Sequence, residues 1–197
     1  MKIYSHRRNS KEELISTPTN FGVEIDIRTD GNEVILQHDP FTGGTLFADW
    51  LDHYSHSGLI LNLKEDGLES QLLSILKDRE IEDFFFLDQS YPSMIKSLKN
   101  NLANKVAARS SEYESLDSIK RLPQPPSYIW CDSFDGNWSH LIPTMGYSRE
   151  IGSVCVIVSP ELQLRQNPEE ILDLKVMLSV DVSNDVAVCT KSPWQWE

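Results

Sequence analysis

The sequence predicts an α/β fold, and within that class a compact TIM (β/α)8 barrel with an extra β-hairpin after the second strand. Nine short apolar runs alternate with helix-length segments over 197 residues. Several of these runs are continuously apolar, which is typical of strands covered on both faces in a parallel sheet. If one run belongs to a hairpin outside the sheet, eight remain, and eight βα units close a barrel. A doubly wound open sheet is the alternative, but it usually carries a Gly-rich phosphate loop after an early strand, and this sequence has none there.

The apolar runs give the expected strands in chain order: 2–6, 22–27, 33–38, 59–63, 83–88, 105–109, 128–132, 153–158 and 185–189. Between them, helices are expected at 45–54, 67–79, 91–102, 111–121, 138–147 and 167–178. Thr45 is a suitable N-cap for the first helix, and Ser111 and Glu114 have the spacing of a capping box. Asn167 followed by Pro168 is a typical helix start. Because no low-complexity linker interrupts this alternation, residues 1–197 are expected to form a single domain.

The composition is ordinary for a globular protein, with 40% hydrophobic and 24% charged residues. The net charge of −12 argues against nucleic acid as a partner, because nucleic-acid-binding surfaces are basic, but it allows a small basic pocket for a phosphate. Each of the three cysteines lies in or beside an apolar run, so buried reduced thiols are expected. The N-terminus turns polar at once, and no stretch approaches the ~20 apolar residues of a membrane span. A cytoplasmic location is therefore expected.

Charged and polar side chains gather at the carboxyl ends of the expected strands, where a TIM barrel places its chemistry. The set is richer in charge than a solvated rim would be, and it is densest in the first third of the chain. Its members are His6, Arg7, Glu24, Asp26, Asn62, Lys64, Asp88, Arg109, Asp132, Glu161 and Lys191. We therefore expect a functional site at this end of the barrel.

The Asp30-Gly31 dipeptide between two apolar runs is a strong hairpin signal. With a three-residue loop over 30–32, Glu24 faces His38 on the same side of the ribbon. With a two-residue loop, Val23 faces His38 instead, and the imidazole turns away from Glu24. Only the first register brings these two side chains together across the ladder.

Taken in order, several motifs resemble those of the glycerophosphodiester phosphodiesterase family. They are His6-Arg7, GVEIDIR (22–28), the Asp-Gly turn, VILQHDP (34–40) and LNLK (61–64). That family shares a TIM-barrel fold with phosphatidylinositol-specific phospholipase C. The resemblance covers roughly residues 2–66, and beyond them the strand–helix rhythm agrees, with Ser-Pro-Glu (159–161) a weaker similarity.

The resemblance implies a phosphoric diester hydrolase that takes a small-molecule, glycerophosphodiester-like substrate and belongs to lipid metabolism. His6 and His38 would be the general acid–base pair, because an unperturbed imidazole pKa of about 6.5 suits proton transfer near neutral pH. Arg7 and Lys64 would bind the non-bridging phosphate oxygens and stabilise their charge. The leaving alcohol, the choice between water and a substrate hydroxyl as nucleophile, and the oligomeric state stay open.

The resemblance also implies one divalent cation, Mg²⁺ or Ca²⁺, held by Glu24, Asp26 and Asn62, since all-oxygen ligation suits hard cations. The family has a third carboxylate where this chain has Asn62, and an amide oxygen can ligate but contributes no charge. Arg8 stands where the family has Gly, and a shortened first connection allows a helix to be left out. These departures motivate an alternative, a catalytically weakened barrel that binds a phosphorylated ligand without turnover. A structural barrel with no ligand is a third possibility.

Overall fold

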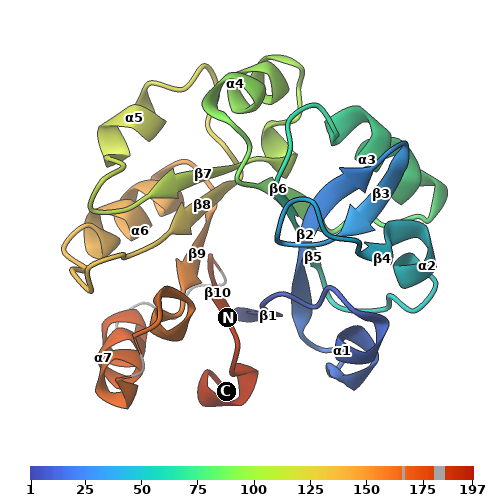
Figure 1. Cartoon of the computed structure of the whole chain (residues 1–197). Coiled ribbons are helices and arrows are strands. Elements are labelled where there is room, and N and C mark those ends of the chain that lie inside the picture. The colour runs from blue at the N-terminus through green and yellow to red at the C-terminus, as the bar shows by residue number, and fades with distance from the viewer. Residues whose placement is uncertain (166, 180–184) are drawn as a thin grey trace.

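The structure is a computed structural model that describes residues 1–165, 167–179 and 185–197. Eight of its strands run parallel to their neighbours around a central axis (Figure 1). They are β1 (Lys2–Ser5), β2 (Gly22–Asp30), β5 (Leu59–Leu63), β6 (Phe84–Leu87), β7 (Ala107–Ser110), β8 (Tyr128–Cys131), β9 (Val154–Val158) and β10 (Val186–Thr190). This is a TIM barrel, and it confirms the predicted fold class.

The ring is continuous except at one seam. Regular ladders join β6, β5, β2, β1, β10, β9, β8 and β7 in that order around the axis. Between β6 and β7 only an isolated parallel bridge, Phe86 to Val106, is formed. The regular sheet therefore does not close, and the eight strands form a barrel with one weakly joined edge.

Helices cover the outside of the ring (Figure 1). They are α1 (Lys11–Ser16), α2 (Phe47–Leu51), α3 (Glu69–Asp78), α4 (Tyr91–Lys99), α5 (Leu116–Lys120), α6 (Leu141–Glu150) and α7 (Pro168–Ser179), with 3-10 turns at Ala103–Lys105, Pro160–Gln163 and Pro193–Gln195. None of the helices in the described ranges is long and apolar enough to cross a membrane. The three cysteines are buried as free thiols, as expected.

Several helix starts differ from the sequence expectation. Helix α3 begins two residues later than expected and α6 three residues later. Thr45 lies in the short strand β4 (Thr45–Leu46), so α2 begins two residues later. The Ser111 hydroxyl accepts the Glu114 amide at 3.1 Å, but this bond forms a turn, and α5 begins only at Leu116. Helix α1 was not expected, although Ser10 and Glu13 form a capping box at its start. The sequence of α1 carries this capping box but has no long apolar face, so its hydrophobic pattern did not predict a helix.

The hairpin after the second strand is present, but its register differs from both of the predicted ones. Strand β2 pairs with β3 (Glu33–Leu36) so that Asp30 faces Glu33 and Ile27 faces Leu36. The loop therefore consists of Gly31 and Asn32, and Gly31 adopts a left-handed φ of 60°. Continuing this count places position 38 opposite position 25. The prediction that Glu24 faces His38 across the ladder is wrong.

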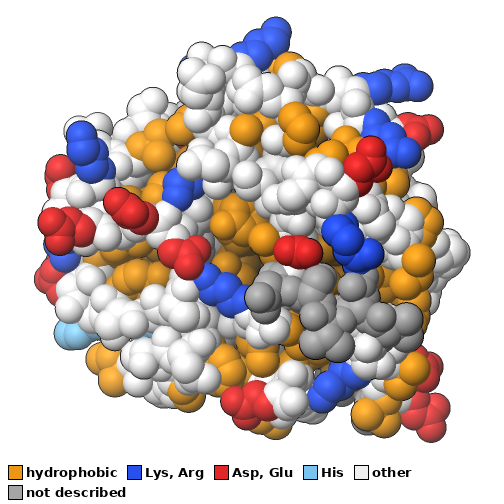
Figure 2. Space-filling view, turned by 180° about the vertical axis from the view of Figure 1, so that it is seen from behind, with side chains coloured by type: hydrophobic (Ala, Val, Ile, Leu, Met, Phe, Trp, Pro, Cys, Tyr) orange, Lys and Arg blue, Asp and Glu red, His pale blue; other side chains and the backbone are white. Residues whose placement is uncertain are grey.

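Alternation along β2 sorts its side chains between the barrel interior and the helices. Val23, Ile25 and Ile27 pack in a cluster with residues of α1, α2 and α3, so they face outward. Glu24 and Asp26 consequently face inward. Below them, the barrel interior is filled by apolar side chains from seven strands, among them Tyr4, Ile60, Phe85, Trp130 and Val156. On the face of the molecule turned away in Figure 1, hydrophobic side chains also fill the middle, with charged ones around them (Figure 2).

Candidate active site

Two carboxylates of β2 form the centre of the site. Glu24 and Asp26 are both fully buried in the barrel interior. Strand β5 runs alongside in a register that pairs Asp26 with Asn62, whose side chain faces the same interior. Ionised groups at such depth need partners, because burial of an unpaired charge is very costly. The neighbouring strands and loops supply these partners as follows.

Glu24 is held by three groups from two elements. Its Oε2 accepts a hydrogen bond from the backbone amide of Arg7 at 2.7 Å, and His6 Nε2 lies 3.6 Å from the same oxygen. Its Oε1 accepts a hydrogen bond from Asn62 Nδ2 at 3.0 Å. Burial and the nearby charge of Asp26 raise the pKa of Glu24 to about 7.

Asp26 is surrounded by positively charged and amide groups. Arg7 Nε lies 3.2 Å from Oδ2, and Asn9 Nδ2 donates to the same oxygen at 2.8 Å. Lys64 Nζ lies 3.2 Å from Oδ1. Asn9 also accepts the backbone amide of Asp26 at 2.9 Å, so this loop is tied to β2 on both sides. Asn9 was not foreseen, because it stands in a loop without a recognisable motif.

The loop after β1 has an unusual backbone at the functional residue itself. Arg7 adopts a left-handed φ of 52°, a conformation that is uncommon for residues other than glycine. This turn directs the Arg7 amide at Glu24 while the Arg8 amide bonds to the Glu24 carbonyl at 2.8 Å. Arg8, which stands where the motif of the similar family has Gly, donates from Nε to the Ser5 hydroxyl at 2.7 Å. The surrounding hydrogen bonds hold the Arg7 backbone in this conformation.

His6 lies close to the carboxylates and is itself mostly buried, with 15% of its side chain exposed. Burial and the positive charge of Arg7 lower its pKa to about 3. The imidazole is therefore neutral at neutral pH and able to accept a proton. Its Nδ1 is buried without a hydrogen-bond partner in the described part of the chain.

His38 is placed differently from the other predicted residues. Its side chain is 42% exposed, and Nδ1 lies 2.8 Å from Asp39 Oδ1. Arg28 holds the His38 carbonyl at 3.1 Å. The pKa of Asp39 is lowered by its hydrogen bond with His38, and the charge of Arg7 adds to this effect. Within the described ranges, no hydrogen bond or ion pair joins His38 to Glu24 or to His6.

A second charged cluster lies beside the first, around Arg109 on β7. Its guanidinium donates to Asp88 and, at 2.5 Å, to Asp132, while Glu114 lies 3.6 Å from its Nε. Gln163 donates to Asp132 at 2.9 Å. Asp88 lies 3.9 Å from Lys64, so the two clusters meet at this residue.

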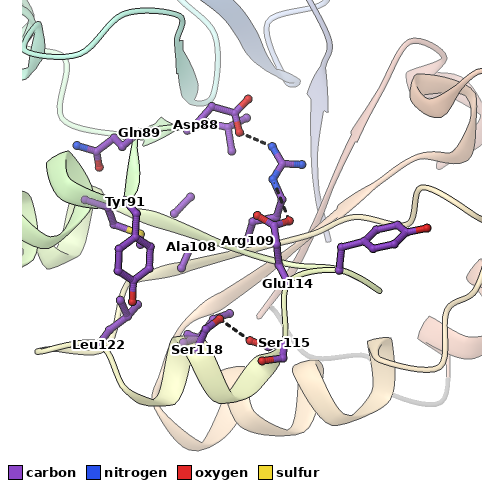
Figure 3. A pocket seen from close by; sticks show the side chains of 14 residues that line it. Asp88, Gln89, Tyr91, Ala108, Arg109, Glu114, Ser115, Ser118 and Leu122 are labelled. Atoms are coloured by element: carbon purple, nitrogen blue, oxygen red, sulfur yellow. Dashed lines mark hydrogen bonds and ion pairs between the residues drawn. The ribbon is translucent and has the colours of Figure 1, made fainter.

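A cavity of about 470 Å³ opens beside Asp88 and Arg109. Figure 3 shows these two residues joined along one side, with Tyr91 and Leu122 on the other and Ser115 and Ser118 at the base. Its remaining walls are mostly apolar and come from α4, β7 and α5. The cavity thus lies at the weakly joined edge between β6 and β7, next to the carboxylate cluster.

The side chains predicted to bind a divalent cation do lie together, but their oxygens are already engaged. Three of the four carboxylate oxygens of Glu24 and Asp26 accept hydrogen bonds, from the Arg7 amide, Asn62 and Asn9. The fourth, Asp26 Oδ1, accepts no hydrogen bond in the described part of the chain and has only the ion pair with Lys64 at 3.2 Å. The Asn62 Oδ1 accepts a hydrogen bond from Lys64 Nζ at 2.8 Å. In the parts that the structure describes, no group of three or more His, Cys, Asp or Glu side chains is placed to hold a metal ion. A divalent cation at these oxygens would have to displace the Lys64 ammonium from both Asn62 and Asp26, so the arrangement of the side chains does not fit Mg²⁺ or Ca²⁺.

These features define a parallel (β/α)8 barrel whose first strands carry a buried charged cluster at their carboxyl ends. No family model and no curated protein matches the sequence. Solved structures match in fold. One is a glycerophosphodiester phosphodiesterase from Parabacteroides distasonis, with 12% identity, a TM-score of 0.69, and 98% of this chain and 94% of that chain covered.

Two further structures extend this likeness. A phosphodiesterase from Oleispira antarctica, in complex with the product sn-glycerol-3-phosphate, is 14% identical with a TM-score of 0.69, covering 100% of this chain and 94% of that one. A Ca²⁺-dependent phosphatidylinositol-specific phospholipase C from Streptomyces antibioticus is 11% identical with a TM-score of 0.58, covering 99% and 94%. At such identities the likeness establishes the fold.

Proposed function

We propose that this chain is a phosphoric diester hydrolase that acts on a glycerophosphodiester-like small molecule. The observation that carries the proposal is the convergence of His6, Arg7 and Lys64 around two fully buried carboxylates. A neutral imidazole and two cations in one place can serve an anionic phosphodiester. The solved structures that share the fold include phosphodiesterases, one with sn-glycerol-3-phosphate bound, which supports the choice of substrate class.

In this proposal Arg7 and Lys64 bind the non-bridging oxygens of the phosphate, and His6 takes the proton of the attacking hydroxyl. The positive charge of Arg7 is one cause of the low pKa of His6. A bound phosphate anion offsets that charge, so the pKa of His6 rises when substrate is present and the imidazole becomes a stronger base. Glu24, 3.6 Å away, then stabilises the imidazolium that forms.

His38 is proposed as the second acid–base group, which protonates the leaving alkoxide. Its hydrogen bond with Asp39 would fix the ring through Nδ1 and leave Nε2 for proton transfer. The cavity beside Asp88 is proposed to receive the alcohol part of the substrate, because Asp88 lies 3.9 Å from Lys64 and the lining combines apolar side chains with hydroxyl groups of Ser115 and Ser118. No step of the proposed reaction passes through a divalent cation, since the Lys64 ammonium already lies against Asp26 and Asn62.

The alternative function is a barrel that binds a phosphorylated ligand without turnover. One specific observation favours it: His38 is half exposed and makes no described contact with the His6 cluster. In that case Arg7 and Lys64 bind the phosphate, but no second group is placed to protonate a leaving alkoxide.

Hydrolysis assays separate the two functions. Glycerophosphocholine and bis(p-nitrophenyl) phosphate are incubated with the protein, and ³¹P NMR distinguishes a cyclic phosphate from the open monoester. We expect turnover that falls by about 10² to 10⁴ in His6→Asn and in His38→Asn, the usual range for losing an acid–base group. His53→Asn is the matched control, because His53 is exposed at the end of α2. Binding of the diester without turnover by the unchanged chain would support the alternative.

A further inference from the structure

The side chain of Lys64 occupies the middle of the carboxylate cluster. It extends from the end of β5 and is only 17% exposed. Its ammonium lies 2.8 Å from Asn62 Oδ1 and 3.2 Å from Asp26 Oδ1. Asn62 thus offers its carbonyl to the ammonium, while its amide nitrogen donates to Glu24 at 3.0 Å. A carboxylate at position 62 could not make both contacts, because it has no hydrogen to donate to Glu24.

Two positive side chains already lie against the carboxylates of the cluster. Arg7 and Lys64 each lie 3.2 Å from an oxygen of Asp26. A divalent cation placed among the same oxygens would lie beside the ammonium, and like charges at such short range repel strongly. Asn62 adds no negative charge that would offset this repulsion.

We propose that the ammonium of Lys64 is the resident cation of this site and takes the place that a divalent metal ion would hold between Asp26 and position 62. The inference rests on the proposed function in one respect: the single charge of Lys64, together with Arg7, then binds the phosphodiester. Asn62 links the two groups, because its Nδ2 donates a hydrogen bond to Glu24 and its Oδ1 accepts one from the Lys64 ammonium.

The consequence is a phosphate site that works without divalent cations. The cluster binds one phosphodiester anion through two fixed positive side chains. A chelator leaves these side chains in place, so phosphate binding and any turnover continue in its presence. By contrast, a site with three oxygen ligands around a metal loses its positive charge when the metal is removed.

The first test measures metal binding directly. The protein is treated with EDTA, dialysed, and titrated with Mg²⁺ or Ca²⁺ in a calorimeter, and its Tm is recorded in parallel. We expect no saturable binding and a Tm shift below about 1 °C. A stable site would raise the Tm by about 5 to 10 °C at one hundred times its Kd. Saturable binding of one ion per chain that disappears in Asp26→Asn overturns the proposal.

A gain-of-function variant gives the complementary test. Lys64→Met combined with Asn62→Glu removes the ammonium and restores a third carboxylate, so we expect Mg²⁺ or Ca²⁺ to raise its Tm. Lys77→Met combined with Asn62→Glu is the matched control, since Lys77 is exposed on α3, and its response should be smaller because Lys64 remains. An equal metal response in both double variants contradicts the role given to Lys64. If these variants do not fold, the titration of the unchanged protein still decides.

The outcomes also separate this inference from the proposed function. Turnover of glycerophosphocholine that persists in EDTA supports both. Turnover that disappears in EDTA and returns with one bound metal ion overturns the role of Lys64 and leaves the hydrolase in place. Absence of turnover together with absence of metal binding overturns the hydrolase and leaves Lys64 as the resident cation.

Discussion

Replacing Glu24 by Gln should change how the stability of this protein depends on pH. In the folded chain the pKa of Glu24 is raised to about 7, against 4.5 for an ordinary Glu, because the side chain is fully buried beside Asp26. A raised carboxyl pKa stabilises the folded state at low pH. This stabilisation is lost as the pH rises from about 4.5 to about 7, because the unfolded chain ionises first.

The magnitude follows from the two pKa values. Each pKa unit corresponds to about 1.4 kcal/mol, so the loss over the whole window is on the order of 3 kcal/mol. His6 works in the opposite direction. Its pKa is lowered to about 3 against an ordinary value of 6.5, so its contribution is complete above 6.5 and is lost as the pH falls. As the pH rises from 5 to 8, the Glu24 effect lowers the free energy of unfolding and the His6 effect raises it, each by roughly 2 to 3 kcal/mol. The two effects therefore largely cancel.

The assay is urea unfolding at several pH values between 5 and 8 for the unchanged protein and for Glu24→Gln. We expect the variant to gain about 2 to 3 kcal/mol relative to the unchanged protein as the pH rises, because only the His6 effect remains. Glu33→Gln, in the exposed hairpin end, makes the same charge change without burial and serves as the control. A difference between the Glu24→Gln and unchanged proteins that is constant across this range would refute the argument.

Three further outcomes are expected. Arg109→Met should lower the free energy of unfolding by about 3 to 5 kcal/mol, measured by urea unfolding, because Asp132 stays buried without its ion pair; a loss below about 1 kcal/mol would contradict this reasoning. Ser118 lies on the exposed side of α5 at the cavity beside Asp88. Ser118→Trp should raise KM for diesters with long alcohols and change KM for bis(p-nitrophenyl) phosphate little. An equal change of KM for both substrates would argue against the proposed place of the alcohol. Asn9→Ala should weaken inorganic phosphate binding measured by calorimetry about tenfold, because Asp26 loses the amide partner that holds it; unchanged affinity would show that Asn9 does not position Asp26.

The strands could be predicted from the sequence because burial on both faces leaves a direct trace, a continuous apolar run. All nine expected runs form strands, and LILNL matches β5 to the residue. Helix starts were harder, because a cap such as Ser111 can close a turn as well as a helix. The two-residue strand β4 has too few residues to show any period.

The cluster at the ends of β1, β2 and β5 was predictable in membership but not in its contacts. Alternation along β2 sends Glu24 and Asp26 to one side, and the parallel neighbour brings Asn62 beside them. The position of His38, by contrast, depends on the length of one loop, and a change of one residue moves it to another partner. Which atom Lys64 contacts depends on its side-chain torsions, and spacing along the chain carries no information about these.

The seam between β6 and β7 is held by the single bridge between Phe86 and Val106, so these two strands can separate there without breaking the ladders of the other strands. Few interstrand hydrogen bonds hold β6 against β7, so amides on these facing edges should exchange with solvent faster than those of β2 and β5. The cavity beside Asp88 lies at this same seam, so a small separation of β6 from β7 would widen it. If the proposed function is right, this seam is the place to change which alcohols fit the cavity, while the carboxylate cluster on the regularly paired strands β2 and β5 keeps its geometry.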